Sequence, residues 1–211
     1  MAAPDMSGPG LLFVMARISR PDIMTEETYM NWYDNDHIAE VISTSGVNSA
    51  FRYIRKQRDV KGCFPYLALY PLDDVAFLKS DEFRGIKVHS ELLPGSGLVY
   101  DLADNEVRYY GLREVFDETK KGKGEFKGHT KTIIPAQFEL KEGSSVDDFE
   151  SWITAKHTAQ VSQAPGYLRT TKFKLLFART NAQSRALKGL PTTDEPSPEP
   201  PTWLVFHEFE S

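Results

Sequence analysis

Cysteine is nearly absent from this chain of 211 residues, because Cys63 is the only one. A single cysteine excludes a disulfide framework and a cysteine-based metal site, and it favours a reducing, cytoplasmic location. Long apolar runs are absent too: no stretch of about 18 apolar residues occurs, so we expect neither a transmembrane helix nor a membrane partner. Residues 1–10, MAAPDMSGPG, lack the basic start and apolar core of a secretory signal and are expected to form a disordered tail.

The motifs that hold common cofactors are missing as well. The chain has no glycine-rich phosphate loop, no dinucleotide-binding fingerprint and no serine nucleophile elbow. Asp36, His37 and Glu40 are close in sequence, but they do not follow a metal-binding spacing such as HExxH, so no metal is expected. The formal net charge of −5 argues against a nucleic-acid partner. The sequence therefore predicts a protein that works without a cofactor.

What the chain does contain is a stretch that occurs twice. Residues 25–46, TEETYMNWYDNDHIAEVISTSG, align without a gap with residues 145–166, SVDDFESWITAKHTAQVSQAPG. Each stretch has a capping residue at its start, acidic residues in the first turn and a glycine where a left-handed helix end would lie. Trp32 aligns with Trp152 and His37 with His157, although both residue types are rare in this chain. We interpret this match as an internal duplication.

The elements around the first stretch follow a simple order. Strands are expected at residues 11–18, 47–55, 66–70 and 106–116, with helices at 25–44, 73–79 and 82–89. This β-α-β-β-α-β order predicts a ferredoxin-like unit over residues 11–117, an antiparallel sheet with both helices on one face. The other face would be apolar and bare, so it must meet a partner.

A Lys/Gly-rich segment at residues 118–130 is expected to be a linker. A second unit then occupies residues 131–211, with strands at 132–140, 167–178 and 203–210 and a helix at 145–164. Residues 180–190 form a short helix or a loop. This unit lacks a counterpart of the last helix and last strand of the first unit. The expected fold class is thus α+β, with two tandem ferredoxin-like units whose antiparallel sheets face each other as an α+β barrel.

The Trp-Tyr-x-x-x-His helix and the later stretch YPLDDVAFLKSDEF resemble the EthD-like proteins of the dimeric α+β barrel superfamily. The resemblance implies a cavity between sheet and helices, or at the mouth of the barrel. It also implies relatives such as cofactor-free monooxygenases, polyketide cyclases, decarboxylases, lactone isomerases and haem enzymes. The helix histidine that often faces the cavity in this family corresponds to His37, and to His157 in the second copy. Tyr33 and Asp36 are replaced there by Ile153 and Lys156, which argues against two equivalent sites.

The candidate catalytic residues lie on the first of these helices. Tyr33 and His37 are one turn apart on one face, and Asp36 lies beside it. A histidine in this setting can act as a general acid or base near neutral pH. The alternative is a core histidine whose ring bonds to a backbone carbonyl. Trp32 is expected on a different side of the helix, packed against the sheet.

A second group of residues is expected to bind the substrate, because aromatic side chains with a few polar tips suit a planar apolar ligand. Arg52 would hold a carboxylate or an enolate oxygen; the alternative is that it pairs with an acidic residue at the surface. The expected substrate-binding residues are Phe13, Met15, Arg17, Phe51, Arg52, Tyr53, Tyr70 and His157.

These features favour a cofactor-independent tailoring enzyme that acts on a small aromatic or polyketide-like molecule. His-assisted proton transfer would drive a cyclisation, decarboxylation or isomerisation, as in a lyase or isomerase. One alternative is a cofactor-free monooxygenase for the same substrate class, and another is a non-catalytic, stress-related or ligand-binding barrel. The chain would be a monomer that closes its own barrel, or a homodimer.

Overall fold

The computed structural model describes residues 5–58, 60–117 and 130–210. The expected linker falls almost wholly outside the described residues, as do residues 1–4 of the expected tail. The end of that tail has a defined place, because the Gly8 N–H donates to the Asp74 carboxylate at 3.0 Å and strand β1 begins at Gly10. The chain forms two compact units: unit 1 comprises Met1–Gly111 and Leu176–Glu199, and unit 2 comprises Leu112–Leu175 and Pro200–Ser211.

Unit 1 is built on four strands. They are β1 (Gly10–Ile18), β2 (Phe51–Ile54), β3 (Tyr66–Leu72) and β4 (Ala103–Phe116), of which β4 continues into unit 2. Their order in the sheet is β2-β3-β1-β4. The central strand β1 pairs antiparallel with both neighbours, so that Leu12 lies opposite Tyr70 on one side and Tyr109 on the other. The four strands expected from the sequence are therefore present, with β2 shorter and β4 longer than expected.

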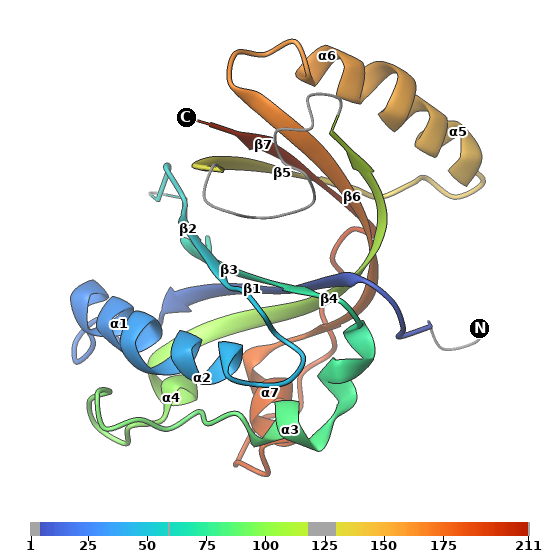
Figure 1. The fold of residues 1–211 in the computed structure, drawn as a ribbon. Coiled ribbons are helices and arrows are strands. Elements are labelled where there is room, and N and C mark those ends of the chain that lie inside the picture. The colour runs from blue at the N-terminus through green and yellow to red at the C-terminus, as the bar shows by residue number, and fades with distance from the viewer. Residues whose placement is uncertain (1–4, 59, 118–129, 211) are drawn as a thin grey trace. The chain divides into compact units, whose positions relative to one another are not determined.

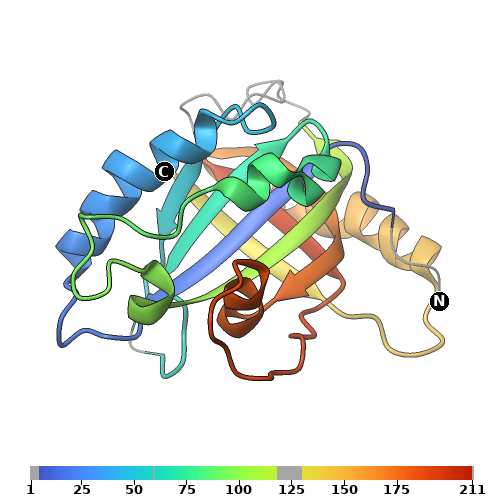
Figure 2. The ribbon, with the colours of Figure 1, turned by 90° about the horizontal axis from the view of Figure 1, so that it is seen from below.

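The helices of unit 1 lie on one face of these strands (Figures 1 and 2). The first helical stretch consists of α1 (Glu26–Trp32), a π-helical turn η1 (Tyr33–His37) and α2 (Ile38–Ile42). As predicted, Thr25 caps α1, and its side chain accepts from the Thr28 N–H. Gly46 does not have a left-handed backbone; it is needed because a Cβ there would overlap the Phe77 ring.

The later helices of unit 1 are short. The segment expected as a helix over 73–79 is a 3-10 turn, η2 (Val75–Lys79), and α3 (Asp81–Gly85) and α4 (Val99–Leu102) follow it. From the distant part of the chain comes α7 (Asn181–Leu187), which begins with a capping box of Thr180 and Gln183. The sequence analysis assigned α7 to the second unit, but the structure packs it in unit 1.

Unit 2 repeats the first helical stretch. It contains β5 (Thr132–Phe138), α5 (Val146–Trp152), a π-helical turn η3 (Ile153–Thr158), α6 (Ala159–Val161), most of β6 (Tyr167–Arg179) and β7 (Trp203–Phe209). Its strands are ordered β6-β7-β5. Because β5 ends the sheet, Pro135 sits on an edge strand, where a missing N–H is tolerated.

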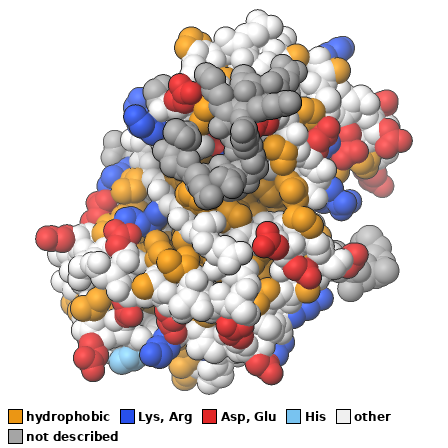
Figure 3. Space-filling view, in the orientation of Figure 1, with side chains coloured by type: hydrophobic (Ala, Val, Ile, Leu, Met, Phe, Trp, Pro, Cys, Tyr) orange, Lys and Arg blue, Asp and Glu red, His pale blue; other side chains and the backbone are white. Residues whose placement is uncertain are grey.

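The complete strand order is β2-β3-β1-β4-β6-β7-β5, so the α+β class is confirmed. Two tandem ferredoxin-like units that face each other as a barrel stay a prediction. None of the helices described is long and apolar enough to cross a membrane. In the lower part of Figure 3, which is unit 1, Lys and Arg side chains are interspersed with Asp and Glu side chains. The described surface on this side is thus of mixed charge.

Candidate functional site

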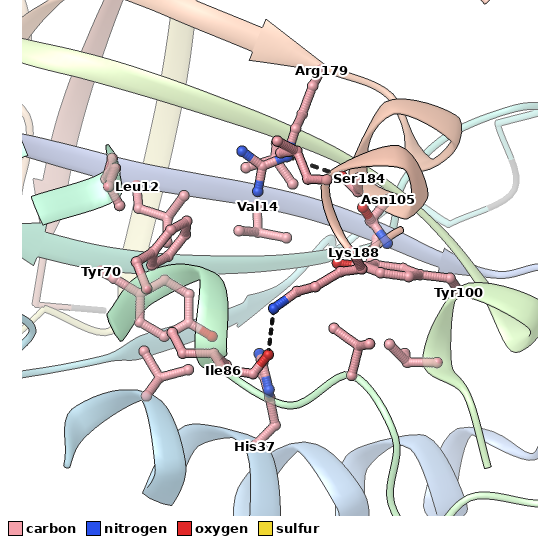
Figure 4. A pocket seen from close by; sticks show the side chains of 18 of the residues that line it. Leu12, Val14, His37, Tyr70, Ile86, Tyr100, Asn105, Arg179, Ser184 and Lys188 are labelled. Carbon is pink, nitrogen blue, oxygen red and sulfur yellow. Dashed lines mark hydrogen bonds between the residues drawn. The ribbon is translucent and has the colours of Figure 1, made fainter. Parts of the chain in front are cut away.

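A cavity of about 430 Å³ lies within unit 1, between its strands and its helices. This volume is in the range that holds small organic ligands. Strand alternation places every second residue of β1 on the cavity wall, and the wall is largely apolar and aromatic. The side chains that dominate the wall include Leu12, Val14, Ala16, Trp32, Tyr33, Tyr70, Val107 and Tyr109. Figure 4 shows His37 directed into this cavity from the helix.

His37 is positioned by the π-helical turn. The Ile38 N–H donates to the Tyr33 carbonyl, five residues earlier, instead of to a carbonyl four residues earlier. Residues five apart are thereby brought above one another, and the His37 ring stacks on Trp32 at 4.9 Å with an interplanar angle of 20°. Tyr33 meets the same ring edge-on at 5.2 Å. The expectation that Trp32 lies on a different side of the helix was wrong, because it assumed regular α-helical spacing.

The surroundings of His37 keep its imidazole neutral. Burial lowers the pKa of His37 to about 4; the Asp36 carboxylate opposes this shift and the Lys188 ammonium adds to it. Nδ1 is buried and has no hydrogen-bond partner among the described residues. A neutral imidazole has one ring nitrogen free to accept a proton. His37 can therefore serve as a general base toward a molecule in the cavity.

Two tyrosines face the same space. The hydroxyl oxygens of Tyr33 and Tyr70 lie 3.0 Å apart and form a hydrogen bond in which either can be the donor. Burial raises the pKa of Tyr33 to about 12, and burial likewise raises the pKa of Tyr70. Both phenols are therefore protonated at neutral pH. Whichever of them does not donate to the other can donate to an oxygen atom of a ligand.

The polar groups that sequence analysis missed come mainly from residues 176–199. Arg179 donates from Nε to Ser184 Oγ at 3.0 Å and from Nη1 to the Tyr109 hydroxyl. Lys188 Nζ donates to the Ile86 carbonyl at 2.6 Å and also to the Arg84 carbonyl. These side chains line the cavity although they follow the first sequence unit by some sixty residues or more. No local sequence motif marks Arg179, Ser184 or Lys188, so the sequence analysis did not identify them as part of the site.

One further missed residue lies on β4. Asn105 lines the cavity, and its Nδ2 donates to Asn181 Oδ1 at 2.9 Å. Its own Oδ1 is buried without a hydrogen-bond partner among the described residues. A buried acceptor that lacks a hydrogen bond lowers the stability of the fold. The cavity thus offers this position to a ligand that carries a hydroxyl or N–H group.

Of the residues expected from the sequence, His37, Tyr33 and Tyr70 line the cavity, whereas Asp36 acts only through its charge. On β1 the expected residues have the opposite parity, because the cavity lies on the helix side of the sheet. The pocket-facing residues alternate with the expected ones. The expected residues that do not line the cavity are Phe13, Met15, Arg17, Phe51, Arg52, Tyr53 and His157.

The two expected arginines are engaged elsewhere. Arg52 forms a two-pronged ion pair with Asp34, at 3.0 and 2.7 Å, and also contacts the Met30 sulfur. This is the surface pairing that the sequence analysis kept as the alternative. Arg17 forms a similar pair with Asp104 at 3.0 and 2.9 Å. Neither guanidinium is therefore directed at the cavity beside His37.

His157 in unit 2 repeats the packing of His37 but not its surroundings. Its ring stacks on Trp152 at 5.2 Å, and its Nε2 lies 3.0 Å from Nε2 of His207. His207 Nδ1 in turn lies 2.8 Å from the Thr170 hydroxyl. His157 is thus part of a hydrogen-bonded chain inside unit 2. Within the described part of the chain, no group of three or more His, Cys, Asp or Glu side chains is arranged to hold a metal ion.

Comparisons with known proteins give one related sequence and a related fold. No family model matches the chain. The chain is 24% identical over 202 residues to the "Core atranone cluster (CAC) protein 1" of Stachybotrys chlorohalonatus. The aligned region covers 96% of this chain and 82% of that protein. The fold of the present chain is similar to the crystal structure of an anthrone oxidase-like protein, with a TM-score of 0.52 and 12% identity. The similarity covers 100% of this chain and 76% of that one.

Proposed function

We propose that this protein is a cofactor-independent tailoring enzyme for a small aromatic or polyketide-like molecule, with His37 as the group that moves a proton. The observation that carries the proposal is a neutral imidazole whose Nδ1 is buried and has no partner among the described residues, in a cavity with aromatic walls. A core histidine kept only for packing would be expected to satisfy its ring nitrogens within the protein.

The chemistry follows from what the cavity holds. His37 would take a proton from an acidic C–H next to a carbonyl or from an enolic or phenolic hydroxyl, which leaves an enolate or a phenolate and an imidazolium. The two charges would stabilise each other in a dry site. The free phenolic O–H of the Tyr33–Tyr70 pair would donate to the enolate oxygen. Return of the proton from His37 to another carbon of a conjugated enolate would give isomerisation. Attack of the enolate carbon on a second carbonyl, with the proton of His37 passed to the new alkoxide, would give cyclisation. With a β-keto acid, His37 would instead take the carboxyl proton; carbon dioxide then leaves, and His37 returns the proton to the carbon of the enolate, which gives decarboxylation.

The relatives support the substrate class in a general way. The related fungal protein is named for the atranone cluster, and the protein of similar fold is named for its likeness to an anthrone oxidase. A tailoring role on compounds of this kind fits a cavity with these walls. We place the reaction among lyases and isomerases, with oxygenation as an outcome that the experiment below distinguishes.

We further propose that residues 11–117 and residues 131–211 derive from tandem copies of one ferredoxin-like unit and that only the first copy carries the catalytic histidine. Support comes from the shared helix cap, π-helical turn and Trp–His stack in both copies. The second copy has Ile153 in place of Tyr33, and its histidine is bonded to His207. Without a phenol and with an occupied ring nitrogen, the second copy lacks the groups that the reaction needs.

The test is proton exchange rather than product formation, because exchange needs no knowledge of the natural product. Wild-type protein would be incubated in D₂O with aromatic ketones that have acidic C–H groups, anthrones and tetralones, and deuterium uptake followed by NMR. His37→Gln should lower the exchange rate by roughly 100-fold or more. His157→Gln, the matched change in the second copy, should leave it unaltered, and melting curves would check that both variants fold.

Three outcomes divide the alternatives. Exchange that His37→Gln leaves unchanged would remove His37 from the mechanism. Consumption of dissolved oxygen with these compounds, measured with an electrode, would assign the protein to the cofactor-free monooxygenases. Tight binding of the ketones without exchange or oxygen uptake would favour the non-catalytic ligand-binding protein.

A further inference from the structure

The charged side chains that line the cavity are all of one sign. Among the described residues, four of them are basic, and neither Asp nor Glu lines the wall; the four are Lys79, Arg84, Arg179 and Lys188. The whole chain carries a formal net charge of −5, and the surface of unit 1 in Figure 3 mixes both signs. A wall with only positive charge is therefore a local property of this cavity.

Of these four residues, Arg179 differs most clearly from an ordinary buried basic residue. Its side chain is only 7% exposed, and it forms no ion pair with a carboxylate of the described residues. A buried arginine is normally paired with an acidic group, because an uncompensated buried charge is costly. Two other buried arginines of this chain follow that rule: Arg108 pairs with Glu106 and Arg169 with Glu208. Arg179 instead bonds to two neutral hydroxyls, so its countercharge is not supplied by the described protein groups.

The neighbours of Arg179 leave a donor free. Guanidinium groups only donate, so the Tyr109 hydroxyl accepts from Arg179 Nη1, and its own hydrogen is left for another acceptor. The guanidinium also lies over the Tyr109 ring, 5.1 Å from its centre, which fixes its direction. In Figure 4, Arg179 reaches into the cavity from above, and Lys188 reaches into it from the side, near His37. Lys188 donates to two carbonyls and keeps one N–H.

We propose that the cavity takes an aromatic carboxylate and that Arg179 and the Tyr109 hydroxyl hold its carboxylate group. The apolar body of this ligand would lie along Leu12, Val14 and Tyr70, within reach of His37. A carboxylate supplies the missing countercharge, and its flat oxygen pair matches guanidinium geometry. The aromatic walls favour a ring system over a small inorganic anion. This assignment of substrate class rests on the proposed function for its reaction, but the binding step stands without it.

The test compares an acid with its neutral ester. Isothermal titration calorimetry near neutral pH would measure binding of 2-naphthoate, its methyl ester and 2-naphthol to the whole chain. The wild-type protein should prefer 2-naphthoate to the ester and to the neutral naphthol by about 10-fold or more. Arg179→Met should weaken 2-naphthoate binding about 10- to 100-fold and leave the ester unchanged. Arg20→Met is the matched control, because Arg20 pairs with Asp22 on the surface and does not line the cavity.

Two further variants guard against a folding defect at this buried position. Arg179→Lys keeps the charge and should retain part of the preference for the acid. Tyr109→Phe keeps the ring under the guanidinium but removes the donor, and should weaken binding of the acid alone. Equal affinity of the wild-type protein for acid and ester would overturn the proposal, and so would failure to bind 2-naphthoate or a preference that Arg179→Met leaves intact.

Failure of this proposal and failure of the proposed function give different results. If acid and ester bind equally while deuterium exchange still depends on His37, the reaction stands and the carboxylate site is wrong. If 2-naphthoate binding depends on Arg179 while no ketone exchanges, the carboxylate site stands and the proton transfer is wrong.

Discussion

Two histidines, one in each unit, are held as neutral rings: His207 is buried, and His37 is half-buried with its Nδ1 out of contact with solvent. Burial lowers the pKa of both His37 and His207 to about 4, and His157 adds to the shift of His207. In the unfolded chain a histidine titrates near pH 6.5. Between these values the unfolded state binds more protons than the folded state, so the stability of the fold rises with pH in this window and falls as the pH drops from about 6.5 to 4.

His37 offers the cleaner measurement, because His207 titrates together with His157. Between pH 7 and pH 5, the lowered pKa of His37 should cost the fold about 2 kcal/mol. His37→Gln should remove that part of the loss. Urea denaturation of both proteins at the two pH values would measure it. Equal losses in the wild-type and variant proteins would show that His37 is not held neutral in the fold.

At the scale of residues, only part of the candidate site could be predicted from the sequence. His37, Tyr33 and Tyr70 were expected near a ligand because aromatic and titratable side chains met in one pattern, and all three line the cavity. Phe13 and Arg17 were chosen on β1, whereas Leu12 and Val14 form the wall. Strand alternation fixes the two sets of residues, but it does not tell which face of the sheet carries the cavity.

At the scale of elements, the helix that carries His37 was predicted, but its π-helical turn was not. The cap at Thr25 and the apolar spacing are the same for a regular helix and for one with a π turn. The bond from the Ile38 N–H to the Tyr33 carbonyl and the stack of His37 on Trp32 show the difference, and the stack recurs for His157 on Trp152. The two copies diverge in burial, since Trp32 is 3% exposed and Trp152 is 41% exposed.

That difference predicts unequal stability effects for the same substitution. Trp32→Ala should lower the free energy of unfolding by about 3–5 kcal/mol, because a fully buried indole is removed from a core. Trp152→Ala should cost about 1–2 kcal/mol, because two fifths of that side chain already lies in water. Urea unfolding followed by circular dichroism would compare the two. A larger loss for Trp152→Ala would contradict the view that unit 1 holds the better packed helix.

At the scale of the whole molecule, the α+β class and the strands of the first unit follow from the sequence, but the division of the chain does not. The repeat and the Lys/Gly-rich segment suggested one boundary at residues 118–130. The structure instead returns Leu176–Glu199 to unit 1, where Asn181 donates to the Tyr100 carbonyl at 3.1 Å and Lys188 to the Ile86 carbonyl at 2.6 Å. Such long-range packing depends on the fold of β6 and α7, and no local sequence pattern predicts it.

Because Leu176–Glu199 belongs to unit 1, we can predict how a fragment that lacks this segment behaves. A fragment of residues 1–117 contains the whole first sequence unit, yet it lacks Arg179, Ser184 and Lys188 and would expose the apolar core that α7 covers. We expect it to unfold without a cooperative transition and not to bind 2-naphthoate. Co-expression with residues 118–211 should restore both properties, because the missing wall is then supplied in trans. Cooperative melting of the isolated fragment, followed by calorimetry, is the direct check: a fragment that melts sharply and binds the acid like the intact chain would mean that residues 176–199 are not part of the site.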